Sequence, residues 1–586
     1  MKLTDYIIDF LASKGVTHFF GMSGGAAVHL FDSVAKNALT DYVCVQHEQS
    51  AAMGADGYTR TTGKLGVAIT TSGPGATNLL TGVCCSYYDS IPTLMLTGQV
   101  ATHRLKGDRN IRQMGFQETD VISIYQTVTK YAYQIRDPKT IRYHLEKAYY
   151  HAFEGRPGPV LLDIPDDLQR SEVDPLTMDG FTPEVTSQQK NLSLSLEKIV
   201  TAIENSKRPI LILGGGVKTP LIPQQEILKF VEKLGIPTLL TWAGLDLLPE
   251  DHPLRVGCFG VYGPRPGNFA VQNSDFILCI GSRLSQNLTG GLLNTFARKA
   301  TIAMVDINSE EMNKFDGRGI SITHRIECKA HDFIKKVSDQ ELSVVYNNES
   351  WLKKISSWKQ RFPLPPSPSS IKNHPHVDAY EFVHRLSAIA PSNESIFIDT
   401  GGNLTWTCNG WQVKKGQQLH SAWNNTPMGY SLPAAIGASF TRRPVSTTCI
   451  IGDGGLMLCL GELATIIHHQ LPIRIFLFNN HCHGIQKQTI ETWLDSRYTG
   501  VDPASGLAFP DFTLLAKAFG FHTIIINDKN KMDQQLHEAY EIKEPVFVNV
   551  EINPDQKLYP VLKYGSSLED QLPPLDKQII EHEILF

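Results

Sequence analysis

The sequence predicts an α/β protein with three successive domains, each built on a doubly wound parallel sheet. Short apolar runs such as 208–216 and 447–455 end in glycine-rich turns, which is typical of buried parallel strands that lead into helices. Helical patterns separate these runs along the chain. Two polar or proline-rich stretches, 178–195 and 362–375, read as linkers and divide the 586 residues into three pieces.

We therefore expect domains at residues 1–178, 190–345 and 375–586. The first and third pieces resemble each other in kind, because each combines a strand, a glycine-rich turn and a helix start. Ligands of such sheets bind outside the carboxyl ends of the strands. The glycine-rich turns are therefore the places where a site is expected.

Composition and charge exclude several classes of protein. Hydrophobic residues make up 42% and charged residues 19%, as in ordinary globular proteins. The net charge of −5, without a basic block or an acidic tail, argues against a nucleic-acid partner. The N-terminus reads as an amphipathic helix rather than a signal peptide, and no segment has the roughly 18 uninterrupted apolar residues of a membrane span. Ten scattered cysteines without a CxxC pair favour reduced thiols, so a cytoplasmic protein is expected.

The C-terminal piece offers a candidate cation site. The turn "GDGG" at 452–455 and the pair "NN" at 479–480 both follow strand-like runs, with one helical stretch between them. Such strand ends lie side by side in a parallel sheet, so Asp453 and Asn480 can share one ion. Oxygen ligands suit Mg²⁺, and the amides of a glycine-rich turn suit a diphosphate. Taken alone, "GDGG" is more simply a tight turn in which glycine supplies a positive φ.

The stretch "NNHCHG" that follows looks at first like a soft-metal site. His481, Cys482 and His483 are residue types that bind zinc. Three successive residues cannot easily converge on one ion, however, and no distant cluster of partners is evident. We therefore do not expect zinc here.

The spacing from "GDGG" to "NN" resembles the thiamine diphosphate motif. Further matches, in order, resemble the large subunit of acetolactate synthase. They are "HEQ" and "GYTR" around Glu48, "TSGPGATNLLTG" (71–82), "GFQETD" (115–120), "GRPGPVLLDIP" (155–165) and "PMGYSLPAAIGAS" (427–439). The resemblance covers the whole chain. It implies the thiamine diphosphate-binding fold, with a pyrimidine-binding domain first, a central FAD-type domain, and a diphosphate- and Mg²⁺-binding domain last.

The resemblance also implies the catalytic residues. In this family a carboxylate binds N1′ of the cofactor's pyrimidine ring and thereby promotes loss of the proton at C2. Glu48 matches this carboxylate, although alone it is more simply a negative charge at a helix N-terminus. Gly24, Gly25 and Gln117 match residues near the reacting carbon, and Gln117 is equally compatible with packing.

The cofactor-binding set follows in the same way. Met428 matches the large apolar residue that holds the cofactor in a bent shape, and the competing interpretation is a core methionine. The implied Mg²⁺ ligands are Asp453, Asn480 and the backbone carbonyl of Cys482. The residues implied for the whole cofactor are Glu48, Pro74, Asn78, Met428, Gly452, Asp453, Gly454, Gly455, Asn480, Cys482, Gly484 and Ile485.

The middle piece resembles an FAD-binding domain only in part. Its first turn lacks the GxGxxG fingerprint. The residues that match FAD contacts of the family are Arg156, Gly214, Gly215, Gly216, Arg283 and Asp306, whereas Ser285, Asn287 and Lys329 depart from it. Any FAD would be structural, because the ligation of keto acids transfers no net electrons. The alternative is an empty domain.

The expected function is that of a decarboxylating carboligase. It would act on pyruvate or a related 2-keto acid and join the activated aldehyde to a second carbonyl. Gln486 and Thr489 replace a small apolar residue and a tryptophan of the family, so a keto-sugar or other aldehyde acceptor stays open. Two further functions also stay open, a simple 2-keto acid decarboxylase and, more remotely, a non-catalytic binding paralogue. The family builds its site between subunits, which implies a homodimer or homotetramer.

Overall fold

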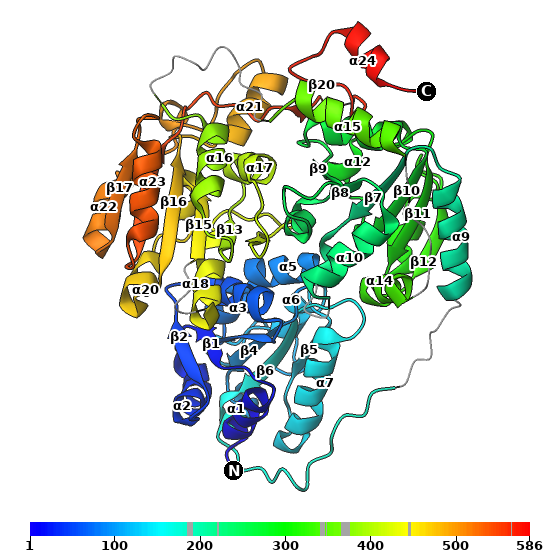
Figure 1. Cartoon of the computed structure of the whole chain (residues 1–586). Coiled ribbons are helices and arrows are strands. Elements are labelled where there is room, and N and C mark those ends of the chain that lie inside the picture. The colour runs from blue at the N-terminus through cyan, green and yellow to red at the C-terminus, as the bar shows by residue number, and fades with distance from the viewer. Residues whose placement is uncertain are drawn as a thin grey trace.

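The computed structural model describes residues 1–184, 192–218, 222–339, 346, 348–364, 376–442, 447–563 and 565–586. It contains three parallel sheets of six strands, one in each domain (Figure 1). The predicted α/β class with three doubly wound domains is confirmed. The predicted linkers at 178–195 and 362–375 fall partly on residues outside these ranges. No helix in the described parts of the chain is long and apolar enough to cross a membrane.

The first and third sheets have the same topology. The first has the order β2-β1-β3-β4-β6-β5 and the third β14-β13-β15-β16-β18-β17. The strands of the first are β1 His18–Gly21, β2 Asp41–Cys44, β3 Gly66–Thr70, β4 Thr93–Gln99, β5 Tyr131–Gln134 and β6 Val160–Pro165. Those of the third are β13 Ser395–Ile398, β14 Gln418–His420, β15 Thr447–Gly452, β16 Ile473–Asn479, β17 His522–Ile526 and β18 Val546–Glu551.

The middle sheet has a different order, β12-β11-β10-β7-β8-β9. Its strands are β7 Pro209–Leu213, β8 Thr238–Leu240, β9 Arg255–Cys258, β10 Phe276–Ile280, β11 Thr301–Asp306 and β12 Ile322–Glu327. Read from β9, this is the 3-2-1-4-5-6 order of dinucleotide-binding folds, with the switch point between β7 and β10.

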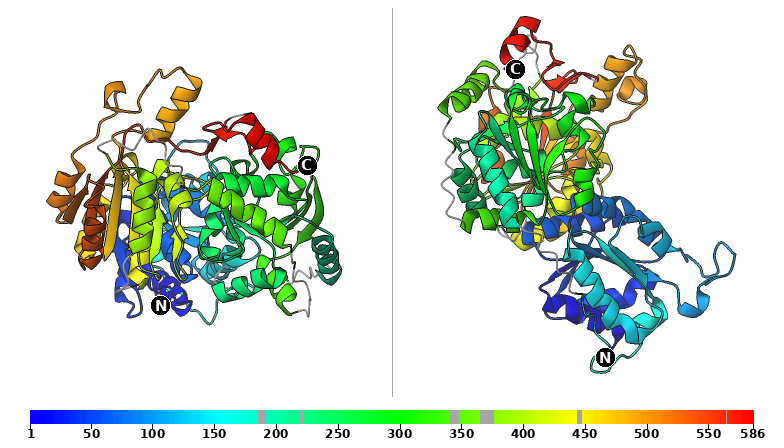
Figure 2. Two further views of the ribbon diagram at one scale, coloured as in Figure 1. Left: turned by 45° about the horizontal axis from the view of Figure 1, so that its top comes forward. Right: turned by 90° about the vertical axis from the view of Figure 1, so that its right-hand side faces the viewer.

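Helices cover both faces of each sheet (Figures 1 and 2). In the first domain they are α1 Leu3–Ser13, α2 Val28–Lys36, α3 Glu48–Thr62, α4 Pro74–Asn78, α5 Leu80–Asp89, α6 Val121–Tyr125, α7 Ile141–Phe153 and α8 Asp166–Gln169. In the middle domain they are α9 Leu192–Glu204, α10 Gln224–Leu234, α11 Arg265–Asn273, α12 Gln286–Thr289, α13 Ser309–Asn313, α14 Ala330–Asp339 and α15 Glu349–Arg361. The third domain has α16 Ala379–Ile389, α17 Gly402–Gly410, α18 Ser431–Arg442, α19 Asp453–Met457, α20 Glu462–His469, α21 Gly484–Trp493, α22 Phe512–Phe519 and α23 Met532–Glu541.

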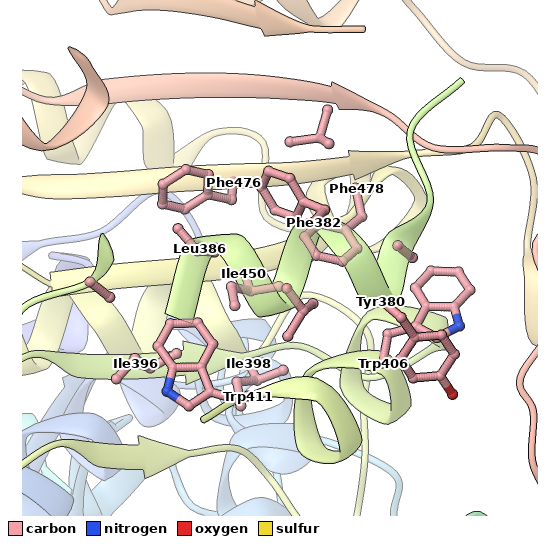
Figure 3. Packing of buried hydrophobic residues seen from close by; sticks show 14 of the residues in the cluster. Tyr380, Phe382, Leu386, Ile396, Ile398, Trp406, Trp411, Ile450, Phe476 and Phe478 are labelled. Atoms are coloured by element: carbon pink, nitrogen blue, oxygen red, sulfur yellow. The ribbon is translucent and has the colours of Figure 1, made fainter. Parts of the chain in front are cut away.

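Alternation along the strands buries both faces of each sheet. In the third domain, Ile450 points into one apolar cluster, and its neighbours Cys449 and Ile451 point into the other. Figure 3 shows the first cluster, where Phe382 of α16 packs against Phe476 of β16. These cores hold the strand ends, and therefore the turns that follow them, at fixed spacing.

The C-terminal segment crosses back to the middle domain, where α24 (Lys577–Glu583) lies beside α15. Glu583 is fully buried and accepts a hydrogen bond of 2.6 Å from the indole nitrogen of Trp358. Trp351, Trp358 and Leu568 join the core cluster of the middle domain. That core therefore includes residues beyond the predicted range 190–345.

The first and third domains meet through α3 and α18, which lie against each other (Figure 1). A Cβ on Gly437 would lie 1.9 Å from the carbonyl oxygen of Gly54, and one on Gly57 would lie 2.0 Å from that of Ala434. Only glycine allows backbones to approach this closely. Because 54 pairs with 437 and 57 with 434, the two helices run antiparallel.

A buried ion-pair network secures the same interface. Arg60 is 6% exposed and binds Asp56 at 2.5 Å and Asp89 at 2.8 Å. The hydroxyl of Tyr430 in the third domain donates to Asp56 at 2.5 Å, and the amide of Trp423 donates to Asp89 at 2.9 Å. Arg60 therefore neutralises two carboxylates that both domains share.

Replacing Arg60 with methionine should destabilise the protein strongly. The substitution leaves Asp56 and Asp89 buried without a cation, which costs about 3–5 kcal/mol of unfolding free energy. The matched control is Lys353→Met, which removes another pair at i,i+4 spacing whose side chains are 76% and 73% exposed. That pair contributes less than about 0.5 kcal/mol. Urea unfolding followed by tryptophan fluorescence measures the unfolding free energy of both variants. Similar losses of unfolding free energy would contradict the role of Arg60 in neutralising the two buried carboxylates.

Candidate active site

The C-terminal half of the site lies at the carboxyl ends of β15 and β16. These strands pair in parallel, with Gly452 opposite Phe478. Asp453 and Asn480 follow the two strand ends directly, and Oδ2 of Asp453 accepts a hydrogen bond of 3.2 Å from the backbone nitrogen of Asn480. Both residues are buried. The sequence analysis predicts that these two strand ends are neighbours, and the pairing of β15 with β16 confirms it.

Three oxygen-bearing groups converge at this point. One end of the Asn480 amide lies 2.8 Å from the carbonyl oxygen of Cys482 and 3.2 Å from Oδ2 of Asp453. With its nitrogen at that end, the amide donates to both oxygens. With its oxygen at that end, three oxygens face one another, an arrangement that requires a cation between them. The donor set, one carboxylate, one amide and one carbonyl, is the set that Mg²⁺ prefers.

Burial raises the pKa of Asp453 to about 7, although the backbone amide of Gly454 donates to its carboxylate at 2.7 Å. A carboxylate held in such an apolar setting gains from a nearby positive charge. The turn therefore both offers oxygens to a cation and is stabilised by one.

The turn that contains Met428 packs on the glycine-rich turn. A Cβ on Gly454 would lie 2.8 Å from Cε of Met428 and 2.6 Å from Nε2 of His483. Gly429 has φ +81°, and a Cβ there would lie 3.1 Å from the carbonyl oxygen of Gly455. Met428 and His483 therefore both lie against the Cα of Gly454, in space that a side chain at 454 would need.

The predicted residues Gly484 and Ile485 begin α21 at the same edge. A Cβ on Gly484 would lie 2.9 Å from Nδ2 of Asn480. Ile485 packs against the cluster shown in Figure 3. The glycine keeps the helix start close to the Asn480 amide.

The thiol of Cys482 has a different partner from its carbonyl group. Its sulfur lies 3.7 Å from the carbonyl oxygen of Pro554, and burial raises its pKa to about 12. His481 lies 3.4 Å from Glu551 and is exposed. Among the described residues, no three His, Cys, Asp or Glu side chains are grouped to hold a metal. The cysteine contributes its carbonyl group, not its sulfur.

The sequence interpretation missed two buried side chains behind this half-site. Asp399 follows β13 directly, and Nδ2 of Asn403, at the start of α17, donates to its carbonyl oxygen at 2.8 Å. Oδ1 of Asn403 lies 3.2 Å from where a Cβ on Gly452 would be. The signal was "DTGGN" after a strand, the same pattern as "GDGG", but nothing local paired it with residue 452.

The N-terminal half of the site lies beyond the carboxyl ends of β1, β2 and β3. Glu48 is the first residue of α3 and is 8% exposed. Nδ2 of Asn78 donates to its Oε2 at 2.9 Å, and Gly75 lies beside its Oε1. Pro74 begins α4, which carries Asn78. The structure thus brings Glu48, Pro74 and Asn78 together, and Asn78 fixes the orientation of the carboxylate.

The predicted glycines and Gln117 surround the same strand ends. A Cβ on Gly24 would lie 2.6 Å from Cβ of Thr71, whereas Gly25 has open space around it. Gln117 has φ +63° and packs against Gly73. The neighbouring Phe116 is 85% exposed, so this part of the loop lies on the surface of the single chain.

The two halves are separated within one chain. Met428 lies just before α18, and Glu48 begins α3 at the opposite end of the antiparallel helix pair. By the 54–437 pairing, Met428 aligns with the end of α3, about 20 Å from Glu48 along the axis at 1.5 Å per residue. Within one chain the two half-sites are therefore separate.

The residues expected to contact FAD lie at the junction of the first and middle domains. Arg156 and Arg283 both reach Glu311, at 3.0 and 3.7 Å, and Lys314 binds it at 2.8 Å. Burial raises the pKa of Asp306. The turn 214–216 packs on Gly281, where a Cβ on Gly214 would lie 2.3 Å from the carbonyl oxygen. The arginines converge from two domains, and backbone packing already explains the glycines at 214 and 216.

Comparisons with known proteins agree with this arrangement. The N-terminal TPP-binding domain of thiamine pyrophosphate enzymes matches residues 1–124, their central domain 196–334 and their C-terminal TPP-binding domain 399–550. A probable acetolactate synthase large subunit of Methanocaldococcus jannaschii is 32% identical over 98% of this chain and 96% of its own length. The acetolactate synthase large subunits of Cyanidium caldarium and Lactococcus lactis are 32% and 30% identical, over 98% and 97% of this chain and 97% and 95% of their own lengths.

Two half-sites of this kind on duplicated sheets, with the three matched domains, define a thiamine pyrophosphate-dependent enzyme. Within that class, the chain belongs to the family of acetolactate synthase large subunits.

Proposed function

We propose that this protein is a thiamine diphosphate- and Mg²⁺-dependent decarboxylating carboligase of the acetolactate synthase type. It acts on pyruvate or a related 2-keto acid and ligates the resulting aldehyde unit to a second carbonyl. The observation that carries the proposal is the convergence of Asp453, Asn480 and the Cys482 carbonyl beside Met428.

Each half-site has its own task in this proposal. When bound, the cofactor supplies the nucleophilic carbon and the electron sink. Asp453, Asn480 and the carbonyl of Cys482 would hold Mg²⁺, and the glycine-rich 452–455 turn would bind the diphosphate. Met428, beside this turn, would support the cofactor. Glu48, oriented by Asn78, holds a proton at the pyrimidine ring and so assists deprotonation of the reacting carbon.

We further propose a homodimer, or a homotetramer made of two such dimers. The separation of Glu48 from Met428 by about 20 Å within one chain supports this, because a single cofactor needs both. A second copy can supply the missing half to each site, as twofold symmetry requires. The exposed Phe116, beside Gln117, is apolar surface that such a contact would cover.

FAD is the third cofactor that we propose, in a structural role. The dinucleotide-type strand order of the middle domain and the convergence of Arg156 and Arg283 support it. Three cationic side chains, those of the two arginines and Lys314, lie near two carboxylates, those of Glu311 and Asp306. The excess positive charge could bind a diphosphate. We expect the purified protein to show the absorption bands of bound oxidised flavin. A protein that lacks these bands, and does not gain them when FAD is added, would contradict this part.

The acceptor is the least constrained part of the reaction. Gln486 and Thr489 are exposed side chains on α21, which begins two residues after Cys482. The amide of Gln486 favours an acceptor with hydroxyl groups, so ligation to a keto sugar or another aldehyde is the second candidate. We also propose a cytoplasmic location, which the ten free cysteines support.

The reaction itself is the first test. With thiamine diphosphate, Mg²⁺ and pyruvate, the enzyme should release CO₂ and form acetolactate. Glu48→Gln should lower turnover by at least about 100-fold, the usual contribution of a positioned acid–base group. Release of CO₂ without acetolactate would favour another acceptor or a simple decarboxylase. Absence of CO₂ would exclude pyruvate as the donor, and a Glu48→Gln variant with full activity would contradict the role of this residue.

Sharing of the site between subunits has a separate test. Glu48→Gln and Asp453→Asn should each be nearly inactive as homodimers. Random mixing gives hybrids in half of the dimers, and each hybrid has one intact site of two, so about a quarter of wild-type activity should return in the mixture and about half in a fraction that contains only hybrids. Coexpression with two affinity tags, followed by assay of the doubly tagged fraction, measures this. Inactive hybrids would show that both residues act within one chain.

A further inference from the structure

Asp399 is a buried carboxylate to which neither half-site assigns a task. It follows β13 directly, is completely buried, and its backbone nitrogen donates to the carbonyl oxygen of Ile450 on β15 at 2.8 Å. A buried charge without a compensating partner is costly, so its contacts indicate what it does.

On one side, the carboxylate holds the turn that follows Met428. The amides of Gly429 and Tyr430 each donate to it at 2.9 Å, and that of Ser431 donates at 3.4 Å. These amides lie at the start of α18, where the helix dipole also favours a negative charge. Three successive amides on one carboxylate fix the direction in which the chain arrives from Met428.

On its other side, the same carboxylate touches the glycine-rich turn. A Cβ on Gly455 would lie 2.0 Å from Oδ2 of Asp399, so the oxygen occupies the space that a side chain would need. The two turns also meet directly, because a Cβ on Gly429 would lie 3.1 Å from the carbonyl oxygen of Gly455. Asp399 is therefore wedged between the two turns.

We propose that Asp399 is a positioning residue that sets the distance between Met428 and the 452–455 turn. The proposal rests on the function proposed above, in which Met428 supports the cofactor and the turn binds its diphosphate. Asp399 itself does not bind the cofactor. It acts by holding two cofactor-binding turns in register.

The chain offers a matched control at the other end of the same strand. Glu394 directly precedes β13, is 1% exposed, and accepts a hydrogen bond of 2.8 Å from Thr448. It is a buried carboxylate in the same sheet, at the edge away from the cofactor-binding turns. A general loss of stability should follow from either substitution, whereas a loss of cofactor affinity should follow only from Asp399.

The experiment compares Asp399→Asn, Glu394→Gln and wild type by titrating each apoenzyme with thiamine diphosphate at saturating Mg²⁺. Intrinsic tryptophan fluorescence gives Kd, and thermal unfolding without cofactor gives Tm. Asp399→Asn places an N–H donor among three amide donors, so Kd should rise at least about tenfold, or about 1.4 kcal/mol. Glu394→Gln should change Kd less than about twofold, whatever its Tm.

The outcomes separate this inference from the function on which it rests. A lower Tm with unchanged Kd in Asp399→Asn would make the residue structural only and overturn the inference. A similar rise of Kd in Glu394→Gln would overturn it too. Wild-type protein that binds no thiamine diphosphate would instead overturn the proposed function. If Asp399→Asn does not fold, Asp399→Glu is tested in its place. This substitution keeps the negative charge but lengthens the side chain between the two turns by one methylene, so it should also raise Kd.

Discussion

The close approach of α3 and α18 is the constraint on which the arrangement of the sites depends. The backbones of the two helices touch because Gly54, Gly57 and Gly437 have no side chain there. The ion pairs of Arg60 stabilise the same contact. Because the helices run antiparallel, Glu48 and Met428 lie at opposite ends of the pair. A helix interface inside one chain thus separates the two residues, and this separation is what supports the proposed second subunit.

The duplicated topology explains why the two half-sites are complementary. The first and third sheets share one strand order, and each has its candidate site residues beyond the carboxyl ends of its strands. In the first domain the helix that follows the edge strand begins with a carboxylate, Glu48. In the third domain the turns after β15 and β16 present oxygens instead. One topology therefore presents a buried carboxylate in one copy and, in the other, the groups that the proposal assigns to a cation.

Sequence reasoning succeeded where the signal is local. The strand-and-turn runs and the order of elements were enough to predict that Asp453 and Asn480 follow adjacent strands, as the register of β15 and β16 shows. It missed α15 and the C-terminal segment as parts of the middle domain, because Trp351 and Leu568 reach that core from outside its sequence range. Asp399 was missed for the same reason, since its partners lie at 429–431 and 455. Long-range packing leaves little trace in a single sequence.

The stretch "NNHCHG" shows how geometry outweighs residue type. The soft-metal ligands in it do not converge, because Cys482 turns its sulfur to Pro554 and His481 lies beside Glu551. What converges instead is the carboxylate of Asp453, the side-chain amide of Asn480 and the backbone carbonyl of Cys482. Residue type alone gives no reason to expect the amide or the backbone carbonyl before a thiol or an imidazole. An amide and a backbone carbonyl carry no charge, so they suit a cation that arrives with the negative charge of a diphosphate. Asp453 is the one acidic group of the three, and burial raises the pKa of its carboxyl group.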